Sequence, residues 1–105
     1  MKKQILIIDD DEDLSFIISD MLEGYGYEVA CAKDSDEAFA LLSDNTYHLI
    51  LLDINLPDTT GFELCKELRQ VSTVPVIFAS ARTSETDRIT GFDIGGVIGD
   101  RLRQL

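Results

Sequence analysis

Two groups of aspartates stand where short apolar segments end, and they are the residues best placed to do chemistry. Asp9, Asp10 and Asp11 follow the segment QILII at residues 4–8, and Asp53 follows the segment LILL at residues 49–52. Ligands of parallel α/β sheets bind outside the carboxyl ends of the strands. If the two apolar segments are neighbouring strands, their carboxylates converge on one small pocket.

Converging carboxylates repel one another unless a cation lies between them, and such hard oxygen ligands suit Mg²⁺. A bound cation would screen the charge of an approaching phosphate and leave one carboxylate free to act as a nucleophile. We therefore predict a Mg²⁺ site here, with Asp53 as the nucleophile. Ser80, at the end of the next apolar segment, is the expected hydroxyl donor to a phosphoryl oxygen on Asp53. Thr83 and Ser84 are weaker alternatives, because they lie further into the loop.

Alternating strands and helices would bring these carboxylates to one edge of a sheet. Helices are expected from Asp11 to about Gly24, from Asp34 or Ser35 to Asp44, over residues 62–68 and, more weakly, over residues 86–94. Strands are expected at residues 4–8, 28–32, 48–52 and 74–79. This alternation predicts an α/β fold, a doubly wound parallel sheet with helices on both faces.

Composition and charge narrow the functional classes. The 105 residues suit one domain, and a net charge of −11 opposes nonspecific binding to nucleic acid or to anionic lipid. The apolar segments are far shorter than the ~20 residues of a membrane-spanning helix. We expect no targeting segment and a cytoplasmic location. Cys31 and Cys65 lack metal-site spacing and are expected to be buried or idle thiols, and His48 is expected to be a surface or hydrogen-bonded structural histidine.

The acidic cluster also has a structural interpretation. Carboxylates are common at helix N-termini, where they complement the helix dipole. We assign Asp11 and Asp13 to that role. Asp9, Asp10 and Asp53 end buried apolar strands, where a structural role for three carboxylates is hard to supply. For these three we favour the functional interpretation, whereas Phe62, Phe78 and the other aromatic residues are expected to be core or interface residues.

Taken together, these motifs resemble the receiver domain of bacterial response regulators, particularly those fused to winged-helix DNA-binding domains. The resemblance runs from about Ile5 to Gly96 and rests on ILIIDDDED, LILLDINLPDTTGFELCKELR, PVIFASAR and DRITGFDIGG. It implies a flavodoxin-like sheet with strand order 2-1-3-4.

The same resemblance assigns roles to individual residues. Asp9 and Asp10 look like the acidic metal-binding pair, Asp53 like the phosphoacceptor and Ser80 like the switch hydroxyl. The backbone carbonyl of Asn55 would be a further Mg²⁺ ligand. Pro57 and Gly61 match the family loop on the acceptor side of the pocket. The resemblance also implies a sensor histidine kinase as phosphoryl donor, and hydrolysis that resets the switch.

The sequence departs from the family after Gly96, where it reads VIGDRLRQL. Leu102 holds the place of the family lysine and Gly99 that of the switch aromatic residue. Arg101 and Arg103 are poor geometric substitutes for that lysine. We therefore expect a receiver domain at residues 1–96 and an atypical tail, a short helix, at residues 97–105. The fifth strand and last helix would be absent or replaced.

The unusual tail leaves two functions open. One is a phosphoacceptor switch that assists its own phosphorylation and dephosphorylation but turns over no small molecule. The other is a signalling-defective interaction domain that self-associates, by edge pairing or domain swapping, through an exposed sheet edge. A phosphohydrolase is disfavoured, because the segment DINLPD has no second aspartate two residues after Asp53 to act as general acid.

Overall fold

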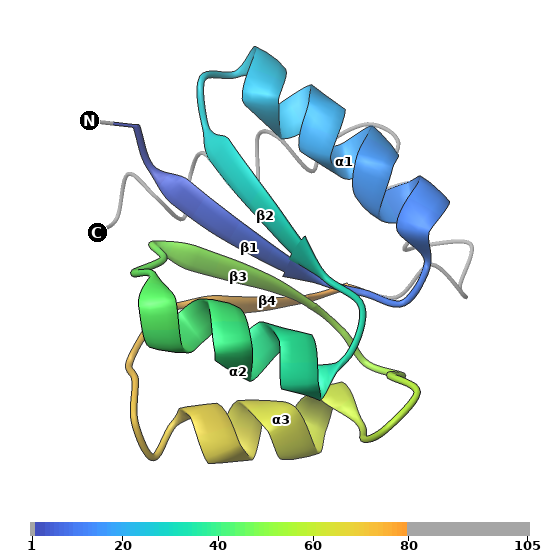
Figure 1. The fold of residues 1–105 in the computed structure, drawn as a ribbon, viewed down its shortest axis with the longest axis vertical. Helices are drawn as coiled ribbons and strands as arrows, with labels where there is room; N and C mark the ends of the chain where they lie inside the picture. The colour runs from blue at the N-terminus through green and yellow to red at the C-terminus, as the bar shows by residue number, and fades with distance from the viewer. Residues whose placement is uncertain (1, 80–105) are drawn as a thin grey trace.

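The computed structural model describes residues 2–79, which form four strands and three helices in alternation (Figure 1). In chain order these are β1 (Gln4–Ile8), α1 (Glu12–Gly24), β2 (Glu28–Ala32), α2 (Ser35–Asp44), β3 (Leu49–Asp53), α3 (Gly61–Leu68) and β4 (Val76–Ala79). The predicted elements are confirmed to within two residues at their ends. Ser80, Thr83, Ser84, the helix expected at 86–94 and the tail at 97–105 lie outside the described residues.

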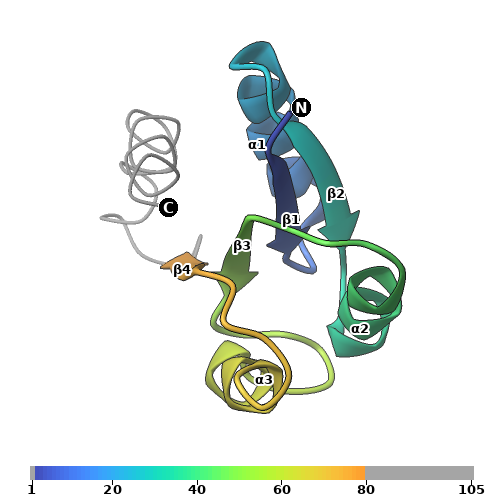
Figure 2. The same cartoon turned by 90° about the vertical axis from the view of Figure 1, so that its left-hand side faces the viewer.

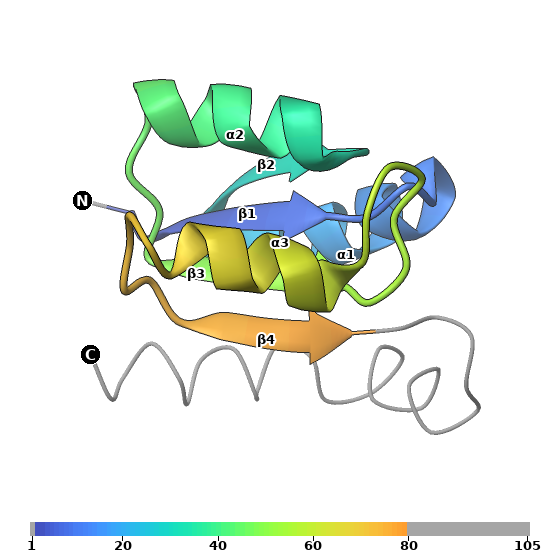
Figure 3. The ribbon, with the colours of Figure 1, turned by 90° about the horizontal axis from the view of Figure 1, so that it is seen from below.

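The strands form one parallel sheet in the order β2-β1-β3-β4, which confirms the predicted topology. Figure 3 shows the strands running in the same direction across the molecule. β1 and β3 are neighbours, with Ile8 paired to Leu52, so the residues that follow both strands reach the same edge. This register places the two groups of aspartates side by side.

Helices cover both faces of the sheet, with α1 on one face and α2 and α3 on the other (Figures 1 and 2). Successive side chains of a strand point to opposite faces. The core on the α1 side therefore takes odd-numbered strand residues, and the core on the other side takes even-numbered ones. The first buried cluster contains Ile5, Ile7, Ile18, Leu22, Leu49 and Leu51. The second contains Leu6, Ile8, Ala32, Ala38, Tyr47, Ile50, Leu52, Leu64 and Leu68.

Each helix begins at a side chain that caps its first turn. Asp11 Oδ1 accepts from the Leu14 N–H at 3.1 Å, Asp34 Oδ1 from the Glu37 N–H at 2.8 Å, and Thr60 Oγ1 from the Glu63 N–H at 3.2 Å. Such caps satisfy N–H groups that have no partner within the helix. The structural role predicted for Asp11 is thereby confirmed. Between α1 and β2 the chain turns at Gly26, whose φ of 92° favours glycine.

For three side chains the structure contradicts one of the two expected roles, burial in the core. Phe62 and Phe78 are 57% and 41% exposed, and their rings contact each other with centroids 5.1 Å apart. Phe62 lies outside the core because α3 buries Gly61, Leu64 and Leu68 against the sheet instead. Cys31 is exposed, and neither cysteine forms a disulfide.

One further expectation, for His48, agrees with the structure. His48 is a hydrogen-bonded structural residue, because its Nδ1 accepts from the Gln4 N–H at 3.0 Å. Among the described helices, none is long and apolar enough to span a bilayer.

Candidate functional site

Three carboxylates converge at the carboxyl ends of β1 and β3. Asp9, Asp10 and Asp53 each offer an oxygen atom, and these atoms all lie within 4.8 Å of one another. Asp9 and Asp53 are buried, with 9% and 5% of their surface exposed, whereas Asp10 is exposed. The convergence predicted from the sequence is confirmed, and it follows from the pairing of β1 with β3.

Ionisation of Asp9 is unfavourable in this cluster. The pKa of Asp9 is raised from 3.8 to about 6, chiefly by burial and further by the charges of Asp53, Asp10 and Asp11. A hydrogen bond from the Asp11 N–H to Asp9 Oδ1, 2.9 Å long, opposes the rise. Buried carboxylates that share a site favour a proton or a cation between them. The arrangement therefore fits a hard divalent cation with oxygen ligands.

The segment between β3 and α3 folds back on the strand end as a tight hairpin. At its base the Gly61 N–H donates to the Ile54 carbonyl at 2.6 Å, and Asn55 and Thr60 form an antiparallel bridge. At its tip the Leu56 N–H donates to the Thr59 carbonyl at 3.1 Å, with Pro57 at the second position of the turn. We call residues 54–60 the acceptor hairpin.

Gly61 closes this hairpin because no larger residue fits there. A Cβ added at Gly61 would overlap the carbonyl oxygen of Asp53, which belongs to the backbone and cannot swing away. The glycine thus lets α3 begin directly against the end of β3. Asn55 lies two residues beyond Asp53 in the sequence and forms the bridge with Thr60 at the base of the hairpin. Of the predicted site residues, Ser80 and its alternatives Thr83 and Ser84 lie outside the described part of the chain.

Sequence reasoning missed one contact next to this site. Asp58, at the tip of the acceptor hairpin, hydrogen-bonds to Ser35 at the start of α2. The two residues are 23 positions apart in the sequence. A contact of this kind follows from the three-dimensional packing of β2, β3 and α2. No local sequence signal marks it.

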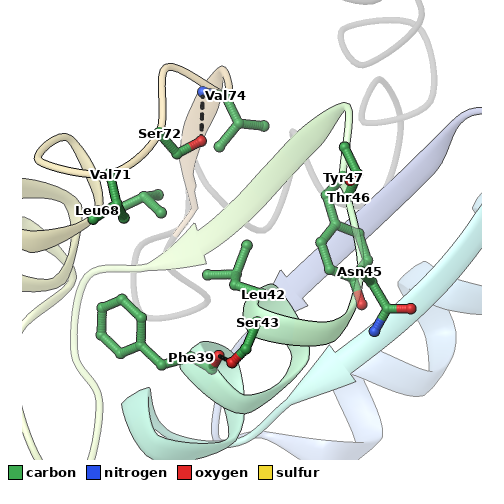
Figure 4. Close-up of a pocket in the computed structure, with 10 residues that line it drawn as sticks. All are labelled: Phe39, Leu42, Ser43, Asn45, Thr46, Tyr47, Leu68, Val71, Ser72 and Val74. Atoms are coloured by element: carbon green, nitrogen blue, oxygen red, sulfur yellow. Dashed lines mark hydrogen bonds between the residues drawn. The ribbon is translucent and has the colours of Figure 1, made fainter.

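Two hollows lie at opposite ends of the sheet. One of about 360 Å³ adjoins the acidic site and is lined by Asp9, Glu12, Ser15, Phe16, Ser19, Cys31, Ala32, Lys33 and Glu37. Another of about 510 Å³ lies between the C-terminal ends of α2 and α3 (Figure 4). Its lining is uncharged and consists of Phe39, Leu42, Ser43, Asn45, Thr46, Tyr47, Leu68, Val71, Ser72 and Val74. Only the first hollow includes a site carboxylate.

Sequence comparison finds a matching protein family and several similar proteins. The response regulator receiver domain family matches residues 5–98. The chain is 41% identical over 92 residues to the transcriptional regulatory protein CpxR of Klebsiella pneumoniae, covering 88% of this chain and 39% of that protein. It is 40% identical over 96 residues to the transcriptional regulatory protein YrkP of Bacillus subtilis, covering 91% and 41%. The chain thus spans about two fifths of these relatives.

Solved structures agree with this assignment. A CheY-like response regulator receiver domain protein from Methanospirillum hungatei superposes with a TM-score of 0.80 at 27% identity, covering 99% of this chain and 96% of that one. The non-phosphorylated HemR receiver domain from Leptospira biflexa gives a TM-score of 0.72 at 30% identity, with 98% and 93% coverage. The fold, the acidic pocket and these relatives lead to one conclusion: the chain belongs to the response regulator receiver domain family.

Proposed function

We propose that this chain is a phosphoacceptor switch that takes a phosphoryl group on Asp53 from a sensor histidine kinase, with Mg²⁺ as cofactor. The observation that carries the proposal is the convergence of Asp9, Asp10 and Asp53 within 4.8 Å at the ends of two neighbouring strands. Asp9 and Asp10 would hold the cation together with Asp53 and the backbone carbonyl of Asn55. Bound Mg²⁺ would neutralise charge on the phosphoryl oxygens as transfer proceeds.

Each residue of the site would have its own role in phosphoryl transfer. A carboxylate oxygen of Asp53 forms a bond to phosphorus while the phosphorus–nitrogen bond of the kinase phosphohistidine breaks, and the imidazole leaves in its neutral form after taking a proton from solvent. Burial of Asp53 would hold this nucleophilic carboxylate in place and limit its access to water. Ser80 would donate a hydrogen bond to a phosphoryl oxygen. Attack of water on phosphorus later releases inorganic phosphate and restores the carboxylate.

The relatives suggest the cellular process in which the switch acts. CpxR and YrkP are transcriptional regulatory proteins and are longer than this chain. We infer that the switch serves transcription regulation through a partner or a further domain, because a net charge of −11 opposes DNA binding by this chain itself.

A second candidate function rests on the sequence after Gly96. The residues VIGDRLRQL lack the family lysine and the switch aromatic residue, and β4 is the last strand of the described sheet. In this candidate, residues 1–96 keep the acidic pocket while the atypical tail at 97–105 prevents signalling. The chain would then self-associate through the β4 edge, by edge pairing or domain swapping. Sedimentation velocity over a range of concentrations tests the self-association.

Intact mass spectrometry after incubation with acetyl phosphate tests the phosphoacceptor function. The wild-type chain should gain one phosphoryl group in the presence of Mg²⁺ and none in EDTA. Asp53→Asn should gain none, whereas Asp20→Asn, a matched change on the exposed side of α1, should label like the wild type. Absence of labelling in a wild-type chain that is folded by circular dichroism would refute the proposal and favour the interaction domain.

A further inference from the structure

The tip of the acceptor hairpin is tied to the first residues of α2. Asp58 Oδ1 and Oδ2 each lie 3.3 Å from the Ser35 backbone nitrogen, whose N–H they share. The Ser35 hydroxyl donates to Asp58 Oδ2. These bonds lower the pKa of Asp58, with the Ser35 hydroxyl as the largest cause, and the Asp36 N–H contributes in the same direction. A single carboxylate thus joins the loop after β3 to the helix that follows β2.

Both ends of this connection matter for the geometry of the site. The base of the hairpin is fixed by the bond from Gly61 to Ile54, but its tip lies five residues beyond Asp53. α2 offers a fixed support for the tip, because Ala38 is fully buried against the second core cluster. The N-terminal end of a helix also favours a carboxylate, since its free N–H groups and its dipole attract negative charge.

We infer that Asp58 is a positioning residue of the phosphoacceptor site, holding the acceptor hairpin against α2 so that Asn55 keeps its place beside Asp53. The inference rests on the proposed function. Asn55 would contribute a backbone carbonyl, and a backbone ligand has no side-chain rotamer with which to adjust. Its position is therefore set by the hairpin alone, and a tip released from α2 lets the carbonyl drift. Small misplacements of a ligand or a reacting group are costly in such sites.

The chain offers a matched control for this role. Asp34 also caps α2, accepting from the Glu37 N–H at 2.8 Å, but its cap bond lies within α2 and does not reach the hairpin. Asp34→Ala therefore weakens the same helix end without releasing the hairpin. Asp58→Ala weakens that end and releases the hairpin as well. If Asp58 only stabilises the start of α2, the two variants should have a similar Mg²⁺ requirement. If Asp58 positions the hairpin, only Asp58→Ala should change it.

The test measures the rate of phosphoryl labelling by acetyl phosphate as a function of Mg²⁺ concentration. In Asp58→Ala the Mg²⁺ concentration for half-maximal rate should rise about three- to tenfold, the range expected for one lost capping contact. In Asp34→Ala it should stay within about twofold of wild type. Asp58→Asn keeps a carbonyl oxygen as acceptor and should recover part of the loss. Adding Ser35→Ala to Asp58→Ala should have little further effect, because the two residues form one contact.

A second measurement follows the hydrogen bonds of the hairpin and requires no phosphorylation. Amide hydrogen exchange at Leu56 and Gly61, which donate the bonds at the tip and base, should be faster in Asp58→Ala and unchanged in Asp34→Ala. Equal Mg²⁺ requirement and equal exchange in the two variants would overturn the inference. A wild-type chain that takes no phosphoryl group refutes the proposed function instead, and the exchange data then show whether Asp58 still holds the hairpin.

Discussion

Replacing Asp9 with asparagine is expected to stabilise the fold in metal-free buffer, even though it removes a site residue. The native pKa of Asp9 is about 6 against an ordinary value of 3.8, so the native state binds this proton more tightly than the unfolded chain. The stability that this group contributes is complete below pH of about 4 and is lost as the pH rises through about 6. At pH 7 the charged form costs the native state at most about 3 kcal/mol.

The gain from the substitution should be smaller than that limit. Asparagine keeps the oxygen that accepts from the Asp11 N–H at 2.9 Å, although a neutral acceptor is weaker than a charged one. Solvent at the exposed Asp10 side also screens the cluster. We expect a gain of about 1–2 kcal/mol at pH 7, which for a domain of this size raises the Tm by roughly 5–10 °C.

Thermal denaturation in EDTA, followed by circular dichroism, measures this effect. Asp20→Asn removes one charge from an exposed position on α1 and should change stability by less than about 0.5 kcal/mol. Saturating Mg²⁺ should stabilise the wild type more than Asp9→Asn, so the advantage of the variant shrinks as the cation is added. A variant that melts at or below the wild type at pH 7 in EDTA, beside an unchanged control, would refute the electrostatic reasoning.

Three further predictions follow from the same region. Mg²⁺ affinity, measured by calorimetry, should fall up to about tenfold per pH unit below pH 6, because a proton on Asp9 competes with the cation; an affinity equal at pH 5 and pH 7 contradicts this. Ser15→Ala should leave stability unchanged or raise it by up to about 1 kcal/mol, since the buried Ser15 hydroxyl has no hydrogen-bond partner among residues 2–79; urea denaturation showing a clear loss would contradict this. Gly61→Ala should cost about 2 kcal/mol or more and slow phosphoryl labelling, because its Cβ overlaps the Asp53 carbonyl; a variant as stable and as active as wild type would show that this contact relaxes freely.

The sequence predicted the sheet well because its central strands carry unbroken apolar segments. Residues 5–8 and 49–52 are buried on both faces, as such segments require in a parallel sheet. β4 begins two residues later than predicted. Pro75 has no N–H to donate to a neighbouring strand, so the regular ladder starts at Val76.

The same patterns predicted the convergence of Asp9, Asp10 and Asp53 but not every side chain near them. Convergence followed from strand ends and topology, which are properties of the whole sheet. The exposure of Phe62 depends on which face α3 turns to the sheet, and eight residues give a weak periodic signal. The bond between Asp58 and Ser35 joins the acceptor hairpin to the first residue of α2, 23 positions away in the sequence, so no local pattern encodes it.

The placing of β1 and β3 in the middle of the sheet has a consequence for motion. Each has a hydrogen-bonded strand on both sides, so its amide protons should exchange only when most of the domain unfolds. Asp9 and Asp53 lie at the carboxyl ends of these two slowly exchanging strands. The acceptor hairpin is held by fewer bonds, at Leu56, at Gly61 and between Asp58 and Ser35, so its amide protons should exchange sooner than those of the central strands. A cation or phosphoryl group that arrives at the site therefore meets two carboxylates fixed by the sheet and a loop fixed by a few surface contacts.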